Sequence, residues 1–438
     1  MDRRGTGPGM SLPPPSDPDQ PIRADRRGHP VVPRSVGQRS AQIVRAATKL
    51  FQEAGFRNVS IEQIGAAVGL TGPAVYRHFP GKHDILSQAL TTQVELVAQL
   101  MADAKSRGRS PGDQLSLLLD GLGDLTAHRD VSTLWRREQR HLQHAELDVM
   151  KEYFDELSEH VASLIVATRP DLSPAAAEVL SAALLSVFSN TSGMRGSLPP
   201  ARLKQVQRAV ADSLITCELP RAPGPDTGDQ TPPARRRPAA RRERILDAAT
   251  RLFSERGFPD VRIDEIAKTA DVSIATLYQE VSGKSDLLLA VLWRGVQGIL
   301  YVSGHALDRV VAGDALDALI RVFVEYSLGE HGRIMPVFTR DLMYLPDAEQ
   351  TRLLNAQADY RAEWIDAIRS RNGLLTAADA NALVQALFGF TCEVIESPRL
   401  RSRPRGRGRP RGDRPGDPEP GRVALSAARV RTWISWPA

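Results

Sequence analysis

A long segment of this chain occurs twice, about two hundred residues apart, and this duplication most constrains how the chain can fold. The segment that starts at Ile43 and the one that starts at Ile245 align without gaps over 44 positions, of which 17 are identical. Repeats of roughly 20–50 residues are typical of solenoids, whereas a repeat spaced this widely corresponds to a whole domain. The 438-residue chain is therefore expected to contain two related units, and each copy tests the interpretation of the other.

The net charge of +5 is unevenly distributed along the chain. Residues 1–40 contribute +3, residues 219–244 contribute +4 and the segment from Arg399 contributes +8, which leaves −10 for the rest. The basic excess lies in segments rich in Pro, Arg and Gly, so charge alone does not indicate nucleic-acid binding. No run of 18 apolar residues is present, the N-terminus lacks an apolar core, and the two cysteines lie in different repeats. We therefore expect no membrane span, signal peptide or disulfide framework, and a cytoplasmic location.

Apolar residues recur at helical spacing through both repeats without strand-like alternation, so we predict an all-α fold of two tandem units. Six breaks at glycine, serine and proline divide the first repeat into about nine helices. The second repeat lacks a counterpart of residues 201–216, so we expect it to be truncated. The predicted divisions are a disordered arm (1–36), a first helix-turn-helix domain (37–84), a first helical domain (85–218), a linker (219–240), a second helix-turn-helix domain (241–286), a second helical domain (287–397) and a disordered tail (398–438).

The start of the first copy carries the signals of three short helices joined by tight turns. An apolar stripe at helical spacing ends at Gly55, and Ser60 followed by Gln63 forms a capping-box pattern for the second helix. Gly69–Leu70 is predicted to form the next turn, and Thr71 to cap the third helix. Such a turn sets the crossing of the second and third helices, so that the third projects toward a DNA major groove.

These residues resemble the N-terminal signature of the TetR family of bacterial transcriptional regulators: A-A-x-x-L-F-x-x-x-G-F, then I-x-x-I, then V-Y-R-H-F-P-G-K. The resemblance implies a helix-turn-helix domain followed by a helical bundle for ligand binding and dimerisation. It also implies that Tyr76 and Lys82 bind DNA phosphates, and that the start of the third helix reads bases. Phe79 is expected to close the small hydrophobic core, and His78 has the same alternative. The residues predicted to contact DNA are Thr71, Gly72, Pro73, Ala74, Tyr76, Arg77, His78 and Lys82.

The second copy keeps one part of this signature and changes another. Tyr278 and Lys284 recur, which favours DNA contact over the alternatives of a core tyrosine and an ordinary solvated lysine. The R-H-F tripeptide, however, becomes Gln279–Glu280–Val281, and a carboxylate next to a phosphate-binding tyrosine repels DNA. We therefore expect weaker DNA binding from the second copy. The residues expected to contribute there are Ser273, Thr276, Tyr278 and Lys284.

The larger helical domains show an amphipathic pattern without catalytic motifs. The family resemblance implies a pocket for a small effector here, lined by aromatic residues of the first copy, with the hydrophobic core as their alternative place. His141 and His144 lack a clear third ligand, so neither a metal site nor a cofactor is expected. No nucleophile elbow, phosphate-binding glycine loop or HExxH motif is found, so the chain is not expected to be an enzyme. The predicted pocket residues are Trp135, Tyr153, Phe154 and Phe188.

A pair of an arginine and an acid also recurs in the larger domains. Arg137–Glu138 lies in LWRREQRHL, and Arg340–Asp341 occupies the matching place in VFTRDLMYL. The recurrence favours an internal polar network over a solvated helix face.

Together these features predict a ligand-responsive DNA-binding transcriptional regulator, a repressor that binds a palindromic double-stranded DNA operator and a small-molecule effector. The alternative is a small-molecule-binding or protein-interaction module that has lost specific DNA binding, which the Gln279–Val281 segment and the truncated second unit favour. For assembly, an internal pseudo-dimer of the two units and a homodimer of chains both stay open. The linker favours the pseudo-dimer, because it holds the units at high effective concentration.

Overall fold

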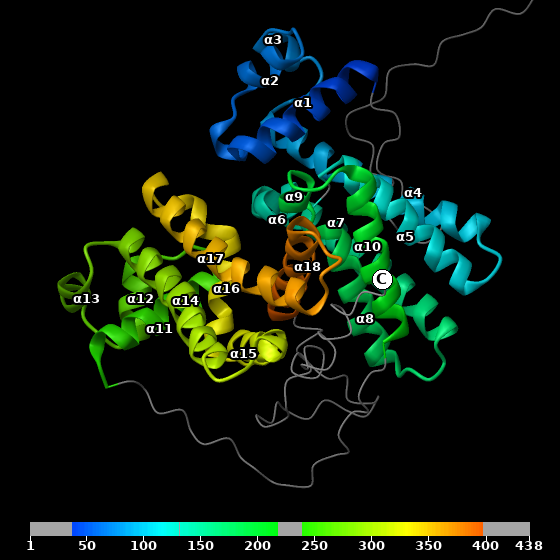
Figure 1. Ribbon diagram of the computed structural model, residues 1–438. Coiled ribbons are helices and arrows are strands. Elements are labelled where there is room, and N and C mark those ends of the chain that lie inside the picture. The colour runs from blue at the N-terminus through cyan, green and yellow to red at the C-terminus, as the bar shows by residue number, and fades with distance from the viewer. Residues whose placement is uncertain (1–36, 131, 218–238, 397–438) are drawn as a thin grey trace, which may run out of the picture.

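The computed structural model of the chain describes residues 37–130, 132–217 and 239–396. Every regular element in these ranges is a helix, which confirms the predicted all-α class (Figure 1). The predicted disordered arm and tail, and nearly all of the predicted linker, lie outside the described residues.

The first unit consists of a helix-turn-helix (HTH) domain followed by a helical bundle. The structure has ten α-helices where the sequence predicted about nine, because a short turn of helix, α9, also forms between two core helices. The elements are α1 (Gln38–Ala54), η1 (Phe56–Asn58), α2 (Ile61–Ala67), α3 (Gly72–Val75), α4 (Lys82–Arg107), α5 (Pro111–His128), α6 (Thr133–Glu138), η2 (Gln139–His141), α7 (His144–Thr168), α8 (Pro174–Ser189), α9 (Ser192–Arg195) and α10 (Pro200–Thr216).

The second unit repeats this order of helices as far as the counterpart of α8. Within residues 239–396 no counterpart of α10 follows. The elements are α11 (Arg241–Arg256), α12 (Ile263–Ala270), α13 (Ile274–Glu280), α14 (Lys284–Leu307), η3 (Ala312–Asp314), α15 (Ala315–Leu328), η4 (Glu330–Arg333), α16 (Ile334–Asp341), η5 (Leu342–Tyr344), α17 (Asp347–Arg371) and α18 (Ala377–Glu396).

The predicted end of the first helix and start of the second are confirmed in the first HTH domain, whereas Thr71 takes the N-cap position of the third helix without a side-chain capping hydrogen bond. Gly55 ends α1 with a φ of 82°, and Ser60 and Gln63 form the reciprocal capping box at the start of α2. The turn after α2 places Gly69 at a φ of 67°, where glycine carries no steric cost. In the second copy Asp271 takes this position at a φ of 56°, a conformation that Asp tolerates better than most residues.

The two units pack on each other through α8 and α10 of the first unit and α18 of the second (Figure 1). One hydrophobic core is shared between them: it includes Leu184 and Leu203 together with Trp364 and Phe390. Because fully buried apolar side chains from both units lie in the same core, this contact resembles the interior of one domain.

An ion pair also joins the two units. Arg202 on α10 donates two hydrogen bonds to the carboxylate of Asp379 on α18, at 2.8 and 2.9 Å, and the carboxylate is fully buried. Hydrogen bonds from Arg202 lower the pKa of Asp379, and Thr376 adds to the same effect. The charge pair therefore fixes how α10 and α18 align.

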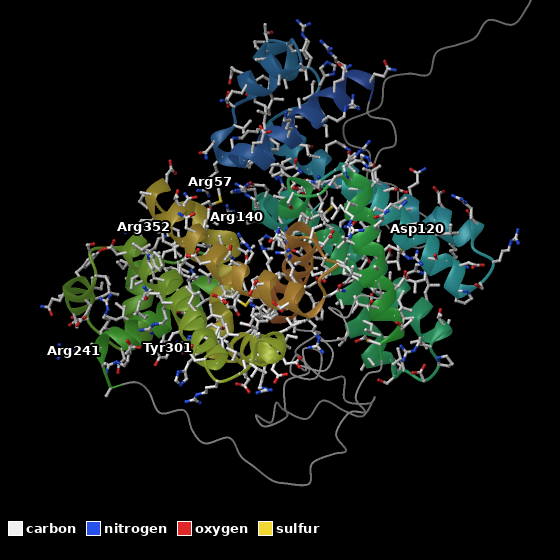
Figure 2. All side chains as sticks on the ribbon, viewed as in Figure 1. Arg57, Asp120, Arg140, Arg241, Tyr301 and Arg352 are labelled. Carbon is white, nitrogen blue, oxygen red and sulfur yellow. The ribbon has the colours of Figure 1, made fainter. Side chains whose placement is uncertain are left out.

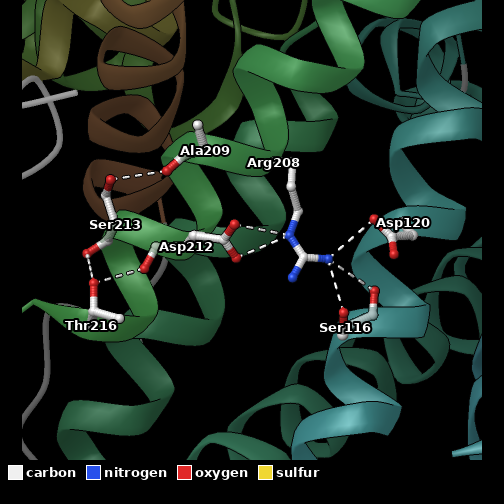
Figure 3. Close-up of polar contacts among 7 residues, drawn as sticks. All are labelled: Ser116, Asp120, Arg208, Ala209, Asp212, Ser213 and Thr216. Atoms are coloured by element: carbon white, nitrogen blue, oxygen red, sulfur yellow. Dashed lines mark hydrogen bonds and ion pairs between the residues drawn. The ribbon is translucent and has the colours of Figure 1, made fainter. Parts of the chain in front are cut away.

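A second arginine on α10 fixes this helix to its own unit (Figure 3). Arg208 donates to Ser116 and Asp120 of α5, and its Nε pairs with Asp212 one turn further along α10. Since α10 is bound to α5 on one side and α18 on the other, it links the first bundle to the second unit.

Helix α14 is long and apolar enough to cross a membrane by length and composition, which counting apolar runs did not reveal. Its apolar side chains pack in the second unit: Leu287, Leu288, Val291 and Leu292 are fully buried against α11, α16 and α17. Core packing therefore accounts for these four apolar residues of the helix.

Candidate DNA-binding surface

The third helix of the first HTH domain is short and lies at the surface. Its N-cap, Thr71, makes no capping hydrogen bond with its side chain, and Thr71 and Pro73 are exposed. Gly72 is buried against the side chain of Glu62, so it presents only backbone atoms. A Cβ at Gly65 would lie 2.8 Å from the carbonyl oxygen of Leu70, so this glycine lets the turn pass close to α2.

The residues after α3 divide between surface and core. Tyr76 is 54% exposed, and Arg77 is also exposed. Phe79 is buried in the HTH core, as predicted. The core alternative for His78 is wrong: its ring is exposed, with Nδ1 3.3 Å from the hydroxyl of Ser40 on α1. Tyr76, Arg77 and His78 thus share the solvent-facing side of the domain.

Lys82 has an internal role that the sequence reading missed. Its Nζ donates to the carbonyl oxygens of Phe56 at 2.7 Å and Val59 at 2.8 Å, and lies 4.5 Å from the centre of the Phe56 ring. Lys284 repeats this arrangement with Phe258 and Val261, both at 2.9 Å. Burial lowers the pKa of both lysines. We call these two arrangements the lysine clasps; that Lys82 also contacts phosphate stays a prediction.

The second HTH domain has a longer and better capped third helix. The hydroxyl of Ser273 accepts a hydrogen bond from the backbone N–H of Thr276 at 3.0 Å, and α13 has seven residues where α3 has four. Tyr278 is 51% exposed and Ile274 is 48% exposed, so the helix presents an aromatic and an aliphatic side chain to solvent. Val281 takes the core position of Phe79.

The two HTH domains differ in net charge. Residues 37–84 contain six Lys or Arg and three Asp or Glu, a net charge of +3 with His neutral. Residues 241–286 contain eight Lys or Arg and nine Asp or Glu, a net charge of −1. Because DNA binding releases counterions in proportion to the phosphates neutralised, the first domain is the better electrostatic match to DNA.

The recurrent Arg–acid pair anchors each HTH domain to its bundle. In the first unit, Arg137 donates to the carbonyl oxygen of Gln52 at 2.8 Å, and Glu138 accepts from the N–H of Phe56 at 3.2 Å. In the second unit Arg340 and Asp341 make the matching bonds to the end of α11 and the residue after Gly257. Burial raises the pKa of Glu138 and of Asp341. The predicted internal polar network is therefore confirmed in both units.

The short helices that follow these anchors, η2 and η5, contact each other across the two units. Figure 2 shows Arg57 and Arg140 between the first HTH domain and α17. Arg140 lies 5.3 Å from the ring centre of Tyr344 and 3.9 Å from the sulfur of Met343. Both HTH domains are thus anchored on segments that contact each other.

The aromatic residues predicted to line a pocket lie elsewhere. Trp135 and Tyr153 pack against the core of the first HTH domain, and Phe154 lies against the Trp135 ring at 4.9 Å. Phe188 is buried in the core that the units share. None of these four residues lines the cavity that the structure has in its second unit.

A cavity of about 260 Å³ lies in the second unit, at its boundary with the first. Helices α14, α15, α16, α17 and α18 form most of its wall, and Arg136 and Asn190 close it from the first unit. A search within one repeat cannot find such a cavity, because two of its lining residues come from the other repeat. Its remaining lining residues are Gly295, Val296, Ile299, Phe323, Tyr326, Ser327, His331, Ile334, Met335, Phe338, Thr339, Gln357, Tyr360, Arg361, Gln385, Phe388, Gly389 and Cys392.

His141 lies at the first anchor, beside Glu138. Burial, with help from Arg140, lowers the pKa of His141 to about 4, so this ring is neutral at pH 7 although its Nε2 lies 3.5 Å from Glu138. Among the described residues, no group of three or more His, Cys, Asp or Glu side chains is placed to hold a metal ion.

Comparison with known proteins places both HTH domains in one family. Residues 43–89 and 245–291 match the family described as bacterial regulatory proteins, tetR family. The HTH-type transcriptional activator FasR of Mycolicibacterium smegmatis is 45% identical over 107 residues, covering 24% of this chain and 49% of that protein. The HTH-type transcriptional repressor KstR of Rhodococcus jostii is 41% identical over 59 residues, covering 14% and 28%. The chain thus spans about half or less of the length of these curated relatives.

Two solved structures align with parts of the chain at low identity. The ketosteroid transcriptional regulator KstR2 of Mycobacterium tuberculosis is 15% identical, covers 41% of this chain and 95% of its own, and has a TM-score of 0.35. A TetR-family regulator from Bordetella parapertussis is 19% identical, covers 39% and 95%, and has a TM-score of 0.36.

The two matched segments and the all-helical fold define two helix-turn-helix domains of one class in this chain. Both matched segments belong to the TetR family, and the chain carries them in tandem, one in each unit. The curated relatives it matches are named as transcriptional regulators.

Proposed function

We propose that this protein is a ligand-responsive transcriptional repressor that works in the cytoplasm and binds a palindromic or pseudo-palindromic operator. The observation that carries the proposal is the first HTH domain, where exposed Tyr76 and Arg77 follow a surface helix on a domain of net charge +3. Phosphate contacts from such side chains position a helix-turn-helix on DNA, and contacts from the start of the helix select the sequence.

Base contacts in this proposal come from the start of the third helices, and phosphate contacts from the residues after it. In the first domain the base-reading group is Thr71, Gly72, Pro73 and Ala74, and the phosphate-binding group is Tyr76, Arg77, His78 and Lys82. In the second domain the contributors are Ser273, Thr276, Tyr278 and Lys284. Exposed Ile274 adds an aliphatic side chain that suits the methyl group of thymine.

The DNA-binding unit in this proposal is the internal pseudo-dimer. A palindromic site requires two HTH domains, and one chain supplies both. The shared core and the ion pair of Arg202 with the buried carboxylate of Asp379 support this choice, because separating the units would expose apolar surface and leave the charge of Asp379 unpaired. Light scattering at micromolar concentration tests it: a mass near 47.9 kDa is expected, and a stable mass of twice this value overturns it.

The effector site in this proposal is the cavity between the units. Its wall is continuous in sequence with the anchors of both HTH domains, since the lining residues Arg136 and Thr339 directly precede Arg137 in α6 and Arg340 in α16. A ligand that changes the position of either helix therefore changes the spacing of the HTH domains, which alters affinity for a site of fixed half-site spacing.

A salt-dependent mobility-shift assay tests the proposed function. The full chain is titrated onto the DNA upstream of its own gene at several salt concentrations, with an unrelated fragment of equal length as control. A specific complex whose affinity falls steeply with salt is expected, with a slope of about −0.9 per phosphate contact. Equal affinity for both fragments overturns the proposal. It would favour a small-molecule-binding or protein-interaction module, to which the net charge of −1 on residues 241–286 already points for the second domain.

A further inference from the structure

The cavity between the units has an apolar part and a polar part. The rings of Phe323 and Phe388 stack with their centres 4.7 Å apart, and the ring of Tyr360, which also lines the cavity, lies 5.8 Å from that of Phe388. Val296, Ile299, Ile334, Met335 and Phe338 extend this apolar wall. Such walls bind the apolar body of a ligand, and a few polar groups then fix its orientation.

Two arginines supply the charge of the polar part. Arg361 donates to Gln357 Oε1 at 2.9 Å, and Arg136 donates to Asn190 Oδ1. No Asp or Glu is among the lining residues, and within the described part of the chain the hydrogen bonds of these two arginines go to amide oxygens. Burial lowers the pKa of Arg361. A half-buried cation without a counter-ion is costly, and an anionic ligand would remove that cost.

A buried hydroxyl in the cavity wall also lacks a partner. Ser327 is 2% exposed, and its Oγ makes no hydrogen bond. The nearby hydroxyl of Tyr326 is occupied, because it donates to the carbonyl oxygen of Gly295 at 2.9 Å. Burial raises the pKa of Tyr326 to about 12, so this phenol adds no negative charge at pH 7. A buried polar group without a partner in the protein is satisfied by a ligand or by water.

We infer that the cavity binds a small lipophilic carboxylic acid as its anion. The carboxylate is bound by Arg361 and Arg136, and the hydrocarbon body lies along the Phe323–Phe388 wall. The volume of about 260 Å³ is slightly below the range of roughly 300–1,000 Å³ typical of ligand pockets, which fits a small acid. The inference rests on the proposed function, since it names the chemical class of the effector.

Arg136 makes this ligand a link between the units. It belongs to the first unit, yet it lines a cavity formed mainly by the second. The next two residues, Arg137 and Glu138, hold the first HTH domain at the end of α1 and at Phe56. An acid in the second unit's cavity therefore acts on the first HTH domain through a single short helix, α6.

Calorimetry on the full chain tests the ligand class without DNA. The probes are octanoate and 4-phenylbutyrate, each compared with the neutral alcohol of the same carbon skeleton. We expect the acids to bind at least tenfold more tightly than the alcohols, and Arg361→Gln to remove most of this difference, as a lost charge-assisted hydrogen bond does. Equal affinity for acid and alcohol overturns the inference.

The matched control is Arg352→Gln. Arg352 lies on the same helix, α17, with a side chain that is 63% exposed and paired with Glu349 outside the cavity. This variant should bind octanoate like the wild type. If Arg361→Gln and Arg352→Gln melt within about a degree of each other and bind octanoate equally, the anion-binding role of Arg361 is wrong.

A measurement of operator affinity with and without octanoate distinguishes this inference from the proposed function. At saturating octanoate the wild type should lose at least about fivefold in operator affinity, the lower end of typical allosteric coupling. Arg136→Gln at its own saturating concentration should lose less than twofold. Acid binding without operator binding contradicts the proposed function alone, whereas operator binding without acid binding contradicts the ligand class alone. A full response in Arg136→Gln overturns the link through α6.

Discussion

The two HTH domains share a scaffold and differ on the face that would meet DNA. Both keep the lysine clasp and the arginine–acid anchor, with matching partners. The first has an uncapped four-residue third helix and a net charge of +3, and the second has a capped seven-residue helix and a net charge of −1. The longer and better capped third helix therefore lies in one domain, and the better electrostatic match to DNA lies in the other. We expect the difference in charge to decide which domain binds DNA more tightly.

The largest expected effect comes from the two exposed tyrosines. Tyr76→Ala should weaken operator binding roughly 10- to 100-fold, because a hydrogen bond to a charged group contributes about 1.5–3 kcal/mol. Tyr278→Ala should weaken it less than about threefold, since the carboxylate of Glu280 opposes a phosphate at this place. Fluorescence anisotropy with labelled operator DNA measures both constants.

Tyr76→Phe sharpens this test. It keeps the ring and removes only the hydroxyl, so a loss as large as that of Tyr76→Ala assigns the effect to a hydrogen bond. Equal losses in the two alanine variants would mean that the second domain contacts DNA as well as the first, and that its negative charge does not weaken the contact.

The next largest effect concerns what the domains share. Lys82→Met and Lys284→Met should each destabilise the chain, because two partly buried carbonyl oxygens lose their hydrogen-bond donor in each variant. The expected loss is about 1.5 kcal/mol, the lower end for a hydrogen bond to a charged group. Urea unfolding measures the loss, with the exposed Lys49→Met as control. If only DNA affinity falls in Lys82→Met and stability is unchanged, the clasp is not structural and the phosphate contact accounts for this lysine.

The sequence predicted local structure in the HTH domains well, because short-range chemistry determines it there. The capping box at Ser60 and Gln63, the break at Gly55 and the core place of Phe79 each depend on residues a few positions away. The clasp of Lys82 was missed because its partners are carbonyl oxygens, which every sequence has. His78 was given a core alternative only because it precedes Phe79; the structure leaves its ring in solvent.

The cavity could not be predicted from either repeat, because its wall is made by the packing of one unit on the other. Aromatic residues were the obvious candidates for a lining, and Trp135 and Phe188 instead fill cores. Arg136 precedes the recurrent Arg–acid pair, and Thr339 takes its place in the second repeat. That difference was visible in the sequence, but only the contact between units gives it a meaning.

A smaller effect is expected from reversing the charge difference between the domains. Glu280→Gln removes a carboxylate beside Tyr278 and should raise operator affinity about two- to fivefold at low salt, with the gain shrinking at higher salt as screening increases. The change leaves the backbone contact intact, because Arg242 bonds to the carbonyl oxygen of residue 280. The control is Glu255→Gln, which removes a carboxylate on α11 and not on the third helix of the domain, α13. Equal gains from both variants would assign the effect to overall charge and remove Glu280 as a local determinant.

The smallest effect separates the two anchors by their response to pH. Burial raises the folded-state pKa of Asp341, so the folded protein holds this proton more tightly than the unfolded chain. The stabilisation is therefore fully present below the ordinary carboxyl pKa of about 4 and is lost as pH rises through the folded-state value. Asp341→Asn keeps an oxygen for the N–H of Phe258 and does not titrate, so it should flatten this decline in thermal stability.

The loss of stability with rising pH should be weaker at the Glu138 anchor than at the Asp341 anchor, because a second titrating group opposes Glu138. The pKa of neighbouring His141 is lowered to about 4, so the unfolded chain binds this proton more tightly, and stability rises as pH increases from about 4 to the unfolded-state pKa near 6.5. In the second unit Tyr344 takes the place of His141. Burial raises the pKa of Tyr344, which moves it still further above this pH range. Glu138→Gln should therefore show a stability that rises more steeply with pH over this range than that of the double variant Glu138→Gln, His141→Asn, in which neither group titrates. Thermal unfolding between pH 4.5 and 7 compares the two slopes, and identical slopes would show that His141 does not oppose Glu138.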